Sequence, residues 1–476
     1  MASQGIAYDS AQGRWVIAAA VLGSGVAFLD GTVVNAALPA IGKDLDAGLA
    51  SLQWVLTAYL LTLGSLLVLG GSLGDLYGRR RVFVAGLFAF SAASLGCAVA
   101  TTSTILIAAR CVQGVAAAAL VPGSLAMIAS SFRVEDRGRA IGAWSGLAGI
   151  STAIGPFLGG WLIDSVSWRF VFVINLPLSA VAIAIALRHV PETRADEEGV
   201  HIDGRGAVLL SLALGGIVYA LIEGPAGHGG AVVIAAAIVG VASLIAFVIV
   251  ETRVEHPMVP LDLFRSRQFS GANAVTFAVY AALSIGMFLL VVHLQNDLGY
   301  SALESGASLL PLTVMMLLFS ARAGALAQRI GPRLPMTVGP VIAGVGVALL
   351  GEVKPGASYL TGVLPGVLVL SVGLTLTVAP LTAAVLAAVD DQHTGIGSAI
   401  NNAVSRIAGL LAIAVIPALV GLDSNFGGGY RSGLRIAGVL AAVGGVLGYF
   451  TIRDSVPVAN ATVLATGMPC HEHRAA

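Results

Sequence analysis

The sequence predicts an all-α integral membrane protein. Of its 476 residues, 57% are hydrophobic and 11% are charged, whereas soluble domains carry roughly 25% charged residues. Charge is confined to short islands, and the uncharged stretch between Arg81 and Arg110 has room for two apolar helices. A helix needs about 20 apolar residues to cross a bilayer, and only helices or closed barrels satisfy their backbone there. Because the alternating pattern of a barrel is absent from the sequence, we expect helices.

Fourteen apolar segments are candidate spans, with boundaries good to a few residues. They cover residues 15–38, 53–73, 82–101, 104–124, 139–163, 168–187, 206–223, 231–250, 270–292, 304–321, 334–350, 358–380, 395–420 and 434–452. Little of the chain remains for a globular domain, which argues against a membrane-tethered enzyme.

The basic residues predict how the spans are oriented. Eighteen of the 25 Lys and Arg residues fall in the segments on the side of the N-terminus, and five fall on the other side. Since basic residues favour the cytoplasmic side, we expect residues 1–14 and the tail 453–476 to be cytoplasmic, in the cell membrane. The opening residues lack the basic region of a cleavable signal, so we expect the first span to be retained.

The rest of the composition excludes other classes. A formal net charge of zero gives no indication of a nucleic-acid partner. Cys97, Cys111 and Cys470 offer no disulfide framework, and we interpret the terminal "CHEH" as an incidental polar end, without a metal. No G-x-x-x-x-G-K-[ST] motif occurs, so we expect an ion gradient as energy source and no cofactor. Only Lys43 and Lys354 are lysines, which indicates a GC-rich bacterial genome.

An internal repeat predicts two similar halves. "GSLGDLYGRR" recurs in weaker form as "GALAQRIGPR", and a second pair of segments aligns Pro122 with Pro380. The two offsets agree, so we expect a six-helix half at 15–188, a linker with two extra spans at 189–269, and a second six-helix half at 270–452. Two parallel halves around a midplane site are typical of alternating-access carriers.

The stretch "GGSLGDLYGRRRVF" concentrates charge between the second and third spans. Gly71 and Gly78 permit a tight turn, and Asp75 is placed to pair with Arg79 or Arg80. The spacing resembles the signature loop of the major facilitator superfamily. This resemblance implies that the five residues form a cytoplasmic latch between the halves.

Further segments extend the resemblance over nearly the whole chain. "LDGTVVNAALPAI", "QWVLTAYLL", "RCVQGVAAAALVPGSLAMI", "GPFLGGWL" and "WRFVFVINLP" are similar to the fourteen-span drug:proton antiporter branch of that superfamily. In "GPFLGG" the small residues supply a kink and a close-packed surface, and the resemblance marks them as an antiporter motif: Gly155, Pro156, Gly159 and Gly160. Gln328 replaces Asp75 in the second half, so any latch is asymmetric.

Two charges lie deep within predicted spans. Asp30 lies nine residues before Pro39, which places it about 13 Å from the outer end of its helix, and Arg110 lies about 9 Å into an inward-running span. Charges at such depth usually face partners or a water-filled cavity. Two interpretations remain open: a structural ion pair, or a carboxylate that exchanges a proton.

Other polar residues complete the candidate site. Arg406 lies near the middle of its span, with Asn402 one turn before it on the same face; a polar stripe that packs helices is the alternative. Glu223 ends the seventh span, where it either contributes to coupling or lies at the water boundary. We expect Asn35, Gln113 and Asn402 to line the substrate cavity.

Together these features predict a proton-coupled antiporter that exports small amphipathic or cationic compounds by alternating access. The alternatives are an importer or symporter of a polar metabolite on the same fold, and a membrane sensor that has lost transport. The deep charges argue against the sensor. We expect no enzymatic activity, and as partners only a small-molecule substrate, protons and the bilayer, with the protein a monomer.

Overall fold

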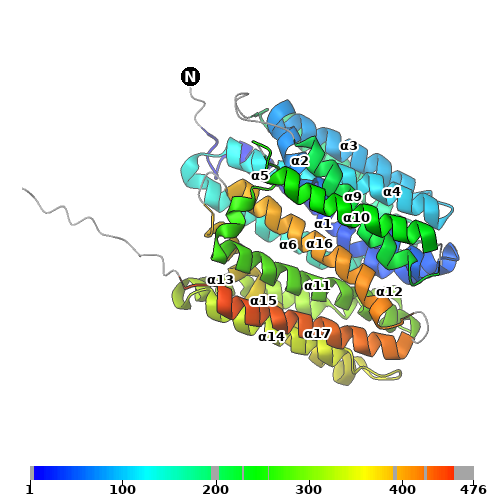
Figure 1. Ribbon diagram of the computed structural model, residues 1–476. Coiled ribbons are helices and arrows are strands. Elements are labelled where there is room, and N and C mark those ends of the chain that lie inside the picture. Colours follow the sequence, from blue (N-terminus) through cyan, green and yellow to red (C-terminus); the bar gives the residue numbers. More distant parts are fainter. Residues whose placement is uncertain are drawn as a thin grey trace, which may run out of the picture.

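A computed structural model describes residues 5–194, 203–227, 230–255, 257–389, 394–422 and 426–454. In these ranges the chain is helical, apart from turns, loops and one isolated β-bridge between Ile6 and Phe132. The long helices run side by side and form one bundle (Figure 1).

The helices of the first part of the chain are α1 (Ala11–Asp44), α2 (Leu49–Tyr77), α3 (Arg79–Ala98), α4 (Ser103–Ala117), α5 (Leu120–Ser131), α6 (Val134–Ser165), α7 (Phe170–Val173) and α8 (Asn175–His189). Two helices follow, α9 (Gly204–Glu223) and α10 (Gly230–Glu251). The last part contains η2 (Leu261–Arg265), α11 (Arg267–Asn296), α12 (Ala302–Ala307), α13 (Leu310–Ile330), α14 (Arg333–Leu350), η3 (Tyr359–Val363), α15 (Leu364–Leu386), α16 (Thr394–Leu419) and α17 (Phe426–Thr451).

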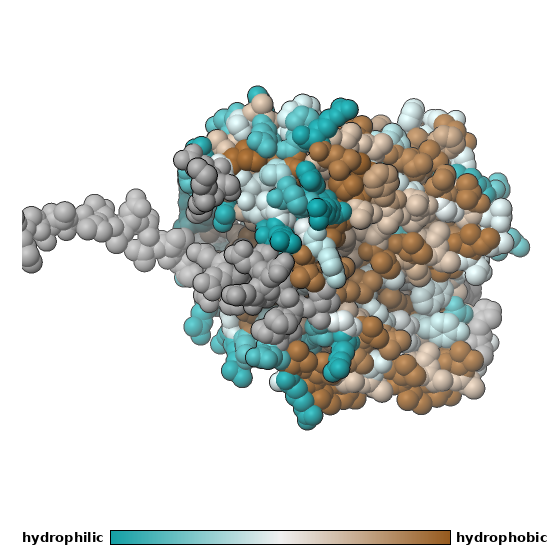
Figure 2. Space-filling view, turned by 90° about the horizontal axis from the view of Figure 1, so that it is seen from above, coloured by the Kyte–Doolittle hydropathy of each residue, from teal (hydrophilic) through white to brown (hydrophobic). Residues whose placement is uncertain are grey.

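The helices confirm the predicted fold class. Each of the fourteen predicted apolar segments falls on a helix or on two consecutive helices. Within the described ranges, thirteen helical stretches are long and apolar enough to cross a membrane. The remaining segment, 139–163, falls on α6, a helix of 32 residues that is not among these thirteen. Figure 2 shows apolar residues over the middle of the molecule and polar residues toward its two ends, as a membrane-embedded bundle requires.

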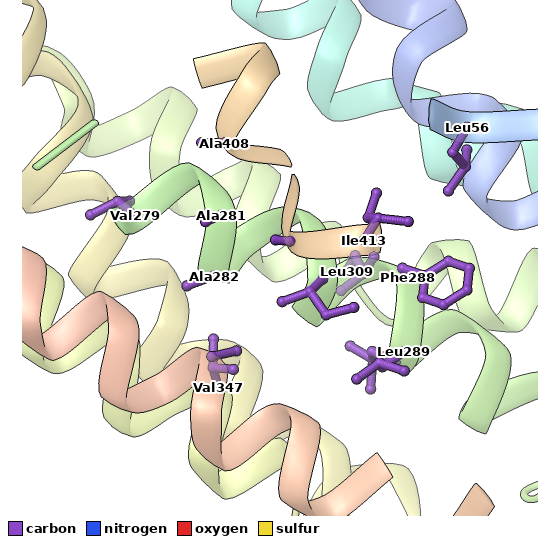
Figure 3. Packing of buried hydrophobic residues seen from close by; sticks show 14 of the residues in the cluster. Leu56, Val279, Ala281, Ala282, Phe288, Leu289, Leu309, Val347, Ala408 and Ile413 are labelled. Atoms are coloured by element: carbon purple, nitrogen blue, oxygen red, sulfur yellow. The ribbon is translucent and has the colours of Figure 1, made fainter. Parts of the chain in front are cut away.

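Apolar packing joins the two parts of the chain. One buried cluster runs from Leu56 on α2 through Ile413 on α16 to Phe288 on α11 (Figure 3). A second cluster lies within α1–α8, around Phe83 and Phe90. The inserted helices α9 and α10 pack against each other, and α9 also contacts α2 and α16. Burial of apolar side chains between helices therefore fixes the faces on which polar groups can meet.

Ion pairs lie at both ends of the bundle, and the end at which Arg79, Arg80 and Arg81 begin α3 is called the arginine-rich end. At the arginine-rich end, Arg80 and Arg81 lie beside Glu192, and Arg139 pairs with Asp9. At the opposite end, Arg169 pairs with Asp44. There Arg431 and Arg435 of α17 both bind Glu352.

Candidate functional site

A buried ion pair lies inside the first part of the bundle. Asp30 on α1 is 0% exposed and Arg110 on α4 is 1% exposed, and a guanidinium nitrogen of Arg110 donates to Asp30 Oδ2. Arg110 also donates through Nε to the Val55 carbonyl at 3.0 Å and through Nη1 to Gln113 Oε1 at 2.6 Å. Breaking such a pair by removing one partner typically costs about 3–5 kcal/mol.

Three neutral side chains, Gln113, Asn175 and Ser94, surround the ion pair. Together with Asp30 and Arg110 they form what we call the polar network. Gln113 Nε2 and Asn175 Nδ2 each donate to Asp30 Oδ1 at 2.9 Å. The same two amides donate to Ser94 Oγ at 2.7 and 3.1 Å. Asp30 thus accepts from three donors on two helices, α4 and α8, while Ser94 anchors both amides from α3. The carboxylate is held in a fully buried position with its charge satisfied.

Aromatic rings shield the guanidinium. The Arg110 Cζ atom lies 4.2 Å from the ring centroid of Tyr59 and 5.8 Å from that of Phe172, and the Tyr59 hydroxyl donates to the Ala27 carbonyl at 2.9 Å. Gly114 brings α4 close to α2, because a Cβ at Gly114 would lie 2.1 Å from Thr62 Oγ1. The cation therefore sits between a carboxylate and an aromatic face, out of water.

A cavity of about 710 Å³ reaches the arginine-rich end between α2, α5, α6 and α16. It is lined by apolar residues of α2 and α5, by Trp144 of α6, and by Ser398 and Asn402 of α16. Of the three residues predicted to line a substrate cavity, Asn402 lines this cavity. Gln113 is instead fully buried in the polar network, and Asn35 donates to the Gly31 carbonyl of its own helix at 3.4 Å. Asp30 is not part of the cavity lining.

At the opposite end the two parts of the chain touch through α6 and α12. A Cβ at Gly160 would lie 2.3 Å from the Ala302 carbonyl oxygen, and one at Gly306 would lie 2.1 Å from the Pro156 carbonyl oxygen. Asp164 Oδ1 and Oδ2 accept from the backbone N–H groups of Ala302 and Leu303 at 3.2 and 2.8 Å. We call this contact the α6–α12 seal. It joins the two parts of the chain at the end of the bundle that lies away from the cavity.

The other two glycines of the predicted antiporter motif face α1. A Cβ at Gly155 would lie 2.0 Å from Thr32 Oγ1, and one at Gly159 would lie 2.6 Å from Val33 Cγ2. Thr32 and Val33 follow Asp30 within one turn. The motif therefore contacts both the helix that carries the carboxylate and, through Gly160, the helix across the seal.

The predicted latch differs from a loop. Helix α2 continues to Tyr77 and α3 begins at Arg79, so Gly71 and Asp75 are helical, and only Gly78, with a φ of 105°, makes the turn. Arg79 pairs with Asp75 at 2.8 Å. The Arg80 guanidinium donates to the Val190 carbonyl at 3.0 Å, and its backbone N–H donates to a carboxylate oxygen of Glu192. In the described residues the contacts of Arg80 are made to the segment that follows α8, whereas Arg79 and Asp75 pair with each other.

The remaining predicted residues lie apart from the polar network. Arg406 on α16 is half-buried, with its Cβ 3.4 Å from the position a Cβ would take at Gly64 of α2. Its Cζ lies 5.4 Å from the Phe28 ring centroid. Glu223 lies at the end of α9 near the opposite end of the bundle, where the Trp54 indole donates to Glu223 Oε1 at 2.8 Å. In the part of the chain that the structure describes, no three His, Cys, Asp or Glu side chains are grouped to hold a metal.

Some residues of the site carry no clear signal in the sequence. Asn175 and Ser94 read as ordinary polar residues of apolar spans, and Asp164 as a carboxylate at the water boundary. Their partners depend on how the helices are rotated. The one available signal was Asn175 in "VINLP", where an amide interrupts an apolar run.

An apolar helical bundle with a buried charge network, a cavity at one end and a seal at the other is the arrangement of a multi-pass membrane transporter. The model of the Major Facilitator Superfamily matches residues 20–413. The chain belongs to this superfamily of transporters.

Its relatives include drug-resistance proteins. The chain is 35% identical to the puromycin resistance protein pur8 of Streptomyces alboniger, over 85% of this chain and 81% of that protein. It is 33% identical to the methylenomycin A resistance protein of Bacillus subtilis, over 88% and 90% of the two chains. The tetracenomycin C resistance and export protein of Streptomyces glaucescens is 32% identical, over 87% and 78%.

Solved structures share the fold. The human organic anion transporter MFSD10 has a TM-score of 0.63 at 17% identity, covering 92% of this chain and all of that chain. An auto-inhibited POT family peptide transporter has a TM-score of 0.64 at 15% identity, covering 93% and 95%. At these identities the likeness shows the fold alone.

Proposed function

We propose that the chain is a proton-coupled antiporter that exports small amphipathic compounds, of the drug and antibiotic class, across the cell membrane. The arginine-rich end is cytoplasmic, together with both termini, because basic residues favour that side. The cavity then faces the cytoplasm and the α6–α12 seal faces outside. In this conformation the protein is ready to receive a compound from within the cell.

The polar network is the main support for the proposed proton coupling. A lone charge at the centre of a bilayer costs about 2.5–3.5 kcal/mol on insertion scales, so such residues are rarely kept without a function. Asp30 is held by donors on separate helices, so a relative movement of α1, α4 and α8 changes its partners. When Arg110 moves away, the carboxylate becomes a proton acceptor; when the ion pair re-forms, the proton is released.

Export rather than import is supported by the relatives and by the glycine motif. Three drug-resistance relatives match over most of their length, and one of them is named as an export protein. Gly155 and Gly159 allow α6 to pack closely on α1, and Gly160 allows it to close on α12. The latch residues Asp75, Gly78, Arg79 and Arg80, with Gly71, hold the cytoplasmic ends of α2 and α3 and are proposed to govern the rate of exchange between conformations.

The test is gradient-driven transport by purified protein in liposomes. An imposed pH gradient should drive uptake of at least one member of a panel of amphipathic antibiotics and dyes against the proton flow, and Asp30→Asn should abolish uphill movement. The matched control is Asp46→Asn, since Asp46 is exposed, has a φ of 48° and lies in a loop, a conformation that Asn tolerates. Movement of compound in the same direction as protons would contradict antiport.

A double substitution separates coupling from stability. Asp30→Asn alone leaves Arg110 unpaired at depth, which is expected to lower stability by about 3–5 kcal/mol. Adding Arg110→Gln removes that uncompensated charge and should restore much of the thermal stability. If Asp30 exchanges the proton, the stable double variant still cannot use a pH gradient. A double variant that regains gradient-driven transport would show that the pair is only structural.

A further inference from the structure

The charges around the cavity are unbalanced. Among the described residues, its charged lining consists of Asp75, Arg79, Arg137 and Arg194. The one acid among them, Asp75, is already paired with Arg79 at 2.8 Å. The described part of the cavity wall therefore carries three arginines and one aspartate, a positive formal charge.

Arg406 adds a cation beyond the inner end of this cavity. It lies one helical turn past Asn402, which lines the cavity, and it faces Gly64, which lies one turn past Val68 of the lining. The side chain is half-buried, and its Nε atom is shielded from solvent with no hydrogen-bond partner among the described residues. A cation in the middle of a membrane bundle that lacks an acidic partner is costly. A ligand that brings an anionic group to this position would offset that cost.

No carboxylate at this depth is open to a cationic compound. In the described ranges, the buried acids are Asp30 and Glu251. Asp30 accepts from Arg110, Gln113 and Asn175 and lies outside the cavity lining. Glu251 ends α10 and accepts from the Val259 backbone. Among the described residues, a cationic compound would meet only Asp75, which Arg79 already pairs, whereas an acid has Arg406.

We propose that the exported compounds carry an acidic group, a carboxylate or an ionised phenol, on an apolar body, and that Arg406 binds this group. The inference rests on the proposed function and narrows its substrate class. A guanidinium offers planar, two-point hydrogen bonding to a carboxylate. The apolar body lies against the leucines and valines of α2 and α5, and the Phe28 ring beside Arg406 provides an aromatic surface.

The experiment measures ligand binding without a pH gradient. Purified protein is titrated with naphthalene and anthracene carboxylates, with their neutral amides and with their aminomethyl counterparts, and the rise in Tm is recorded. These compounds share an apolar body and differ in charge. The acids should raise the Tm in a concentration-dependent manner, and the amines should not. Equal or stronger stabilisation by the amines, or no stabilisation by any acid of the series, overturns the proposal.

Variants then assign the charge to Arg406. Arg406→Gln should weaken acid binding by about tenfold or more, as expected for a lost charge-assisted hydrogen bond, and Arg406→Lys should retain part of it. Arg322→Gln is the matched control, because Arg322 is exposed on α13, and it should bind acids like the wild type. If Arg406→Gln does not fold, the wild-type ligand series still tests whether acids bind, and Arg406→Lys still tests whether Arg406 binds them. Unchanged affinity in a folded Arg406→Gln protein removes the residue from the site.

This outcome is separable from that of the transport test. If acids bind through Arg406 but no pH gradient drives their movement, the proposed coupling fails and the inferred substrate class stands. If amines are exported against a proton gradient while acids do not bind, the proposed function stands and the inference falls.

Discussion

Closure of the α6–α12 seal depends on the absence of a side chain at Gly160. A Cβ there would lie 2.3 Å from the Ala302 carbonyl oxygen and 2.6 Å from its carbon, whereas carbon atoms in good contact are about 3.5–4.0 Å apart. In Gly160→Ala the two helices must separate by roughly 1 Å. Overpacking of this kind costs about 1–3 kcal/mol. Only the closed conformation bears this cost, so the conformational equilibrium should shift about 5- to 150-fold toward opening at the sealed end.

Cysteine labelling measures this shift. One reporter replaces Ala36, which is 1% exposed and whose carbonyl accepts from Gln295 across the sealed end at 3.0 Å. The other replaces Ala126, which lines the cavity. In a background without the native cysteines, Gly160→Ala should speed labelling at position 36 and slow it at position 126. The control is Gly142→Ala on the same helix, where an added Cβ meets nothing within 4 Å.

A second substitution should weaken the same α6–α12 contact in a different way. Asp164→Ala removes two hydrogen bonds to backbone N–H groups of α12 without adding bulk, so it should shift labelling in the same direction as Gly160→Ala. Unchanged rates at both reporters in Gly160→Ala, or faster labelling at the cavity reporter, would refute the assignment of the seal.

Three further predictions concern single side chains elsewhere. Gly78→Ala should lower the Tm, since Gly78 has a φ of 105° and an added Cβ would lie 2.7 Å from Glu192 Oε1; an unchanged Tm would show that the turn tolerates a side chain. The guanidinium groups beside Glu352 lower its pKa from 4.5 to about 2, so its ion pairs stabilise the fold above the ordinary value and are lost as pH falls. The Tm difference between wild type and Glu352→Gln should therefore be constant above about pH 5 and shrink toward pH 2, and a difference that grows on acidification would contradict this. Glu251→Gln should raise the Tm by an amount equivalent to about 1 kcal/mol, because Glu251 Oε1 and Asp203 Oδ2 both lie beside Gly206 with no hydrogen-bond donor among the described residues; a lower Tm would argue against it.

The helices were predictable because each must present an apolar surface long enough to cross the bilayer. A run of apolar residues of that length can be recognised directly in the sequence. Their ends were less predictable. Helices α1 and α2 continue to Asp44 and Tyr77, beyond the predicted 15–38 and 53–73. Polar residues past the hydrocarbon core extend a helix without an apolar signature, so the predicted latch loop is mostly helix.

The charged members of the site were predictable from depth, and their partners were not. Asp30 and Arg110 are conspicuous because a charged side chain inside an apolar span is energetically costly and therefore rare. Whether they meet, and whether Asn175 and Ser94 join them, depends on the rotation and crossing of four helices, which spacing along one helix cannot give. For the same reason Gln113, expected in the cavity, lies in the network.

The glycine motif explains how the carboxylate and the seal can influence each other. Gly155 and Gly159 fix one face of α6 against α1, close to Asp30, while Gly160 and the Pro156 carbonyl form the contact with α12. Gly155 and Gly160 are about 7.5 Å apart along the helix. Coupling between sites travels through packed elements that have two discrete arrangements. Because the Thr32 and Val33 side chains of α1 pack directly against Gly155 and Gly159, we expect a shift of α6 that opens the seal to displace the segment of α1 that carries Asp30 as well.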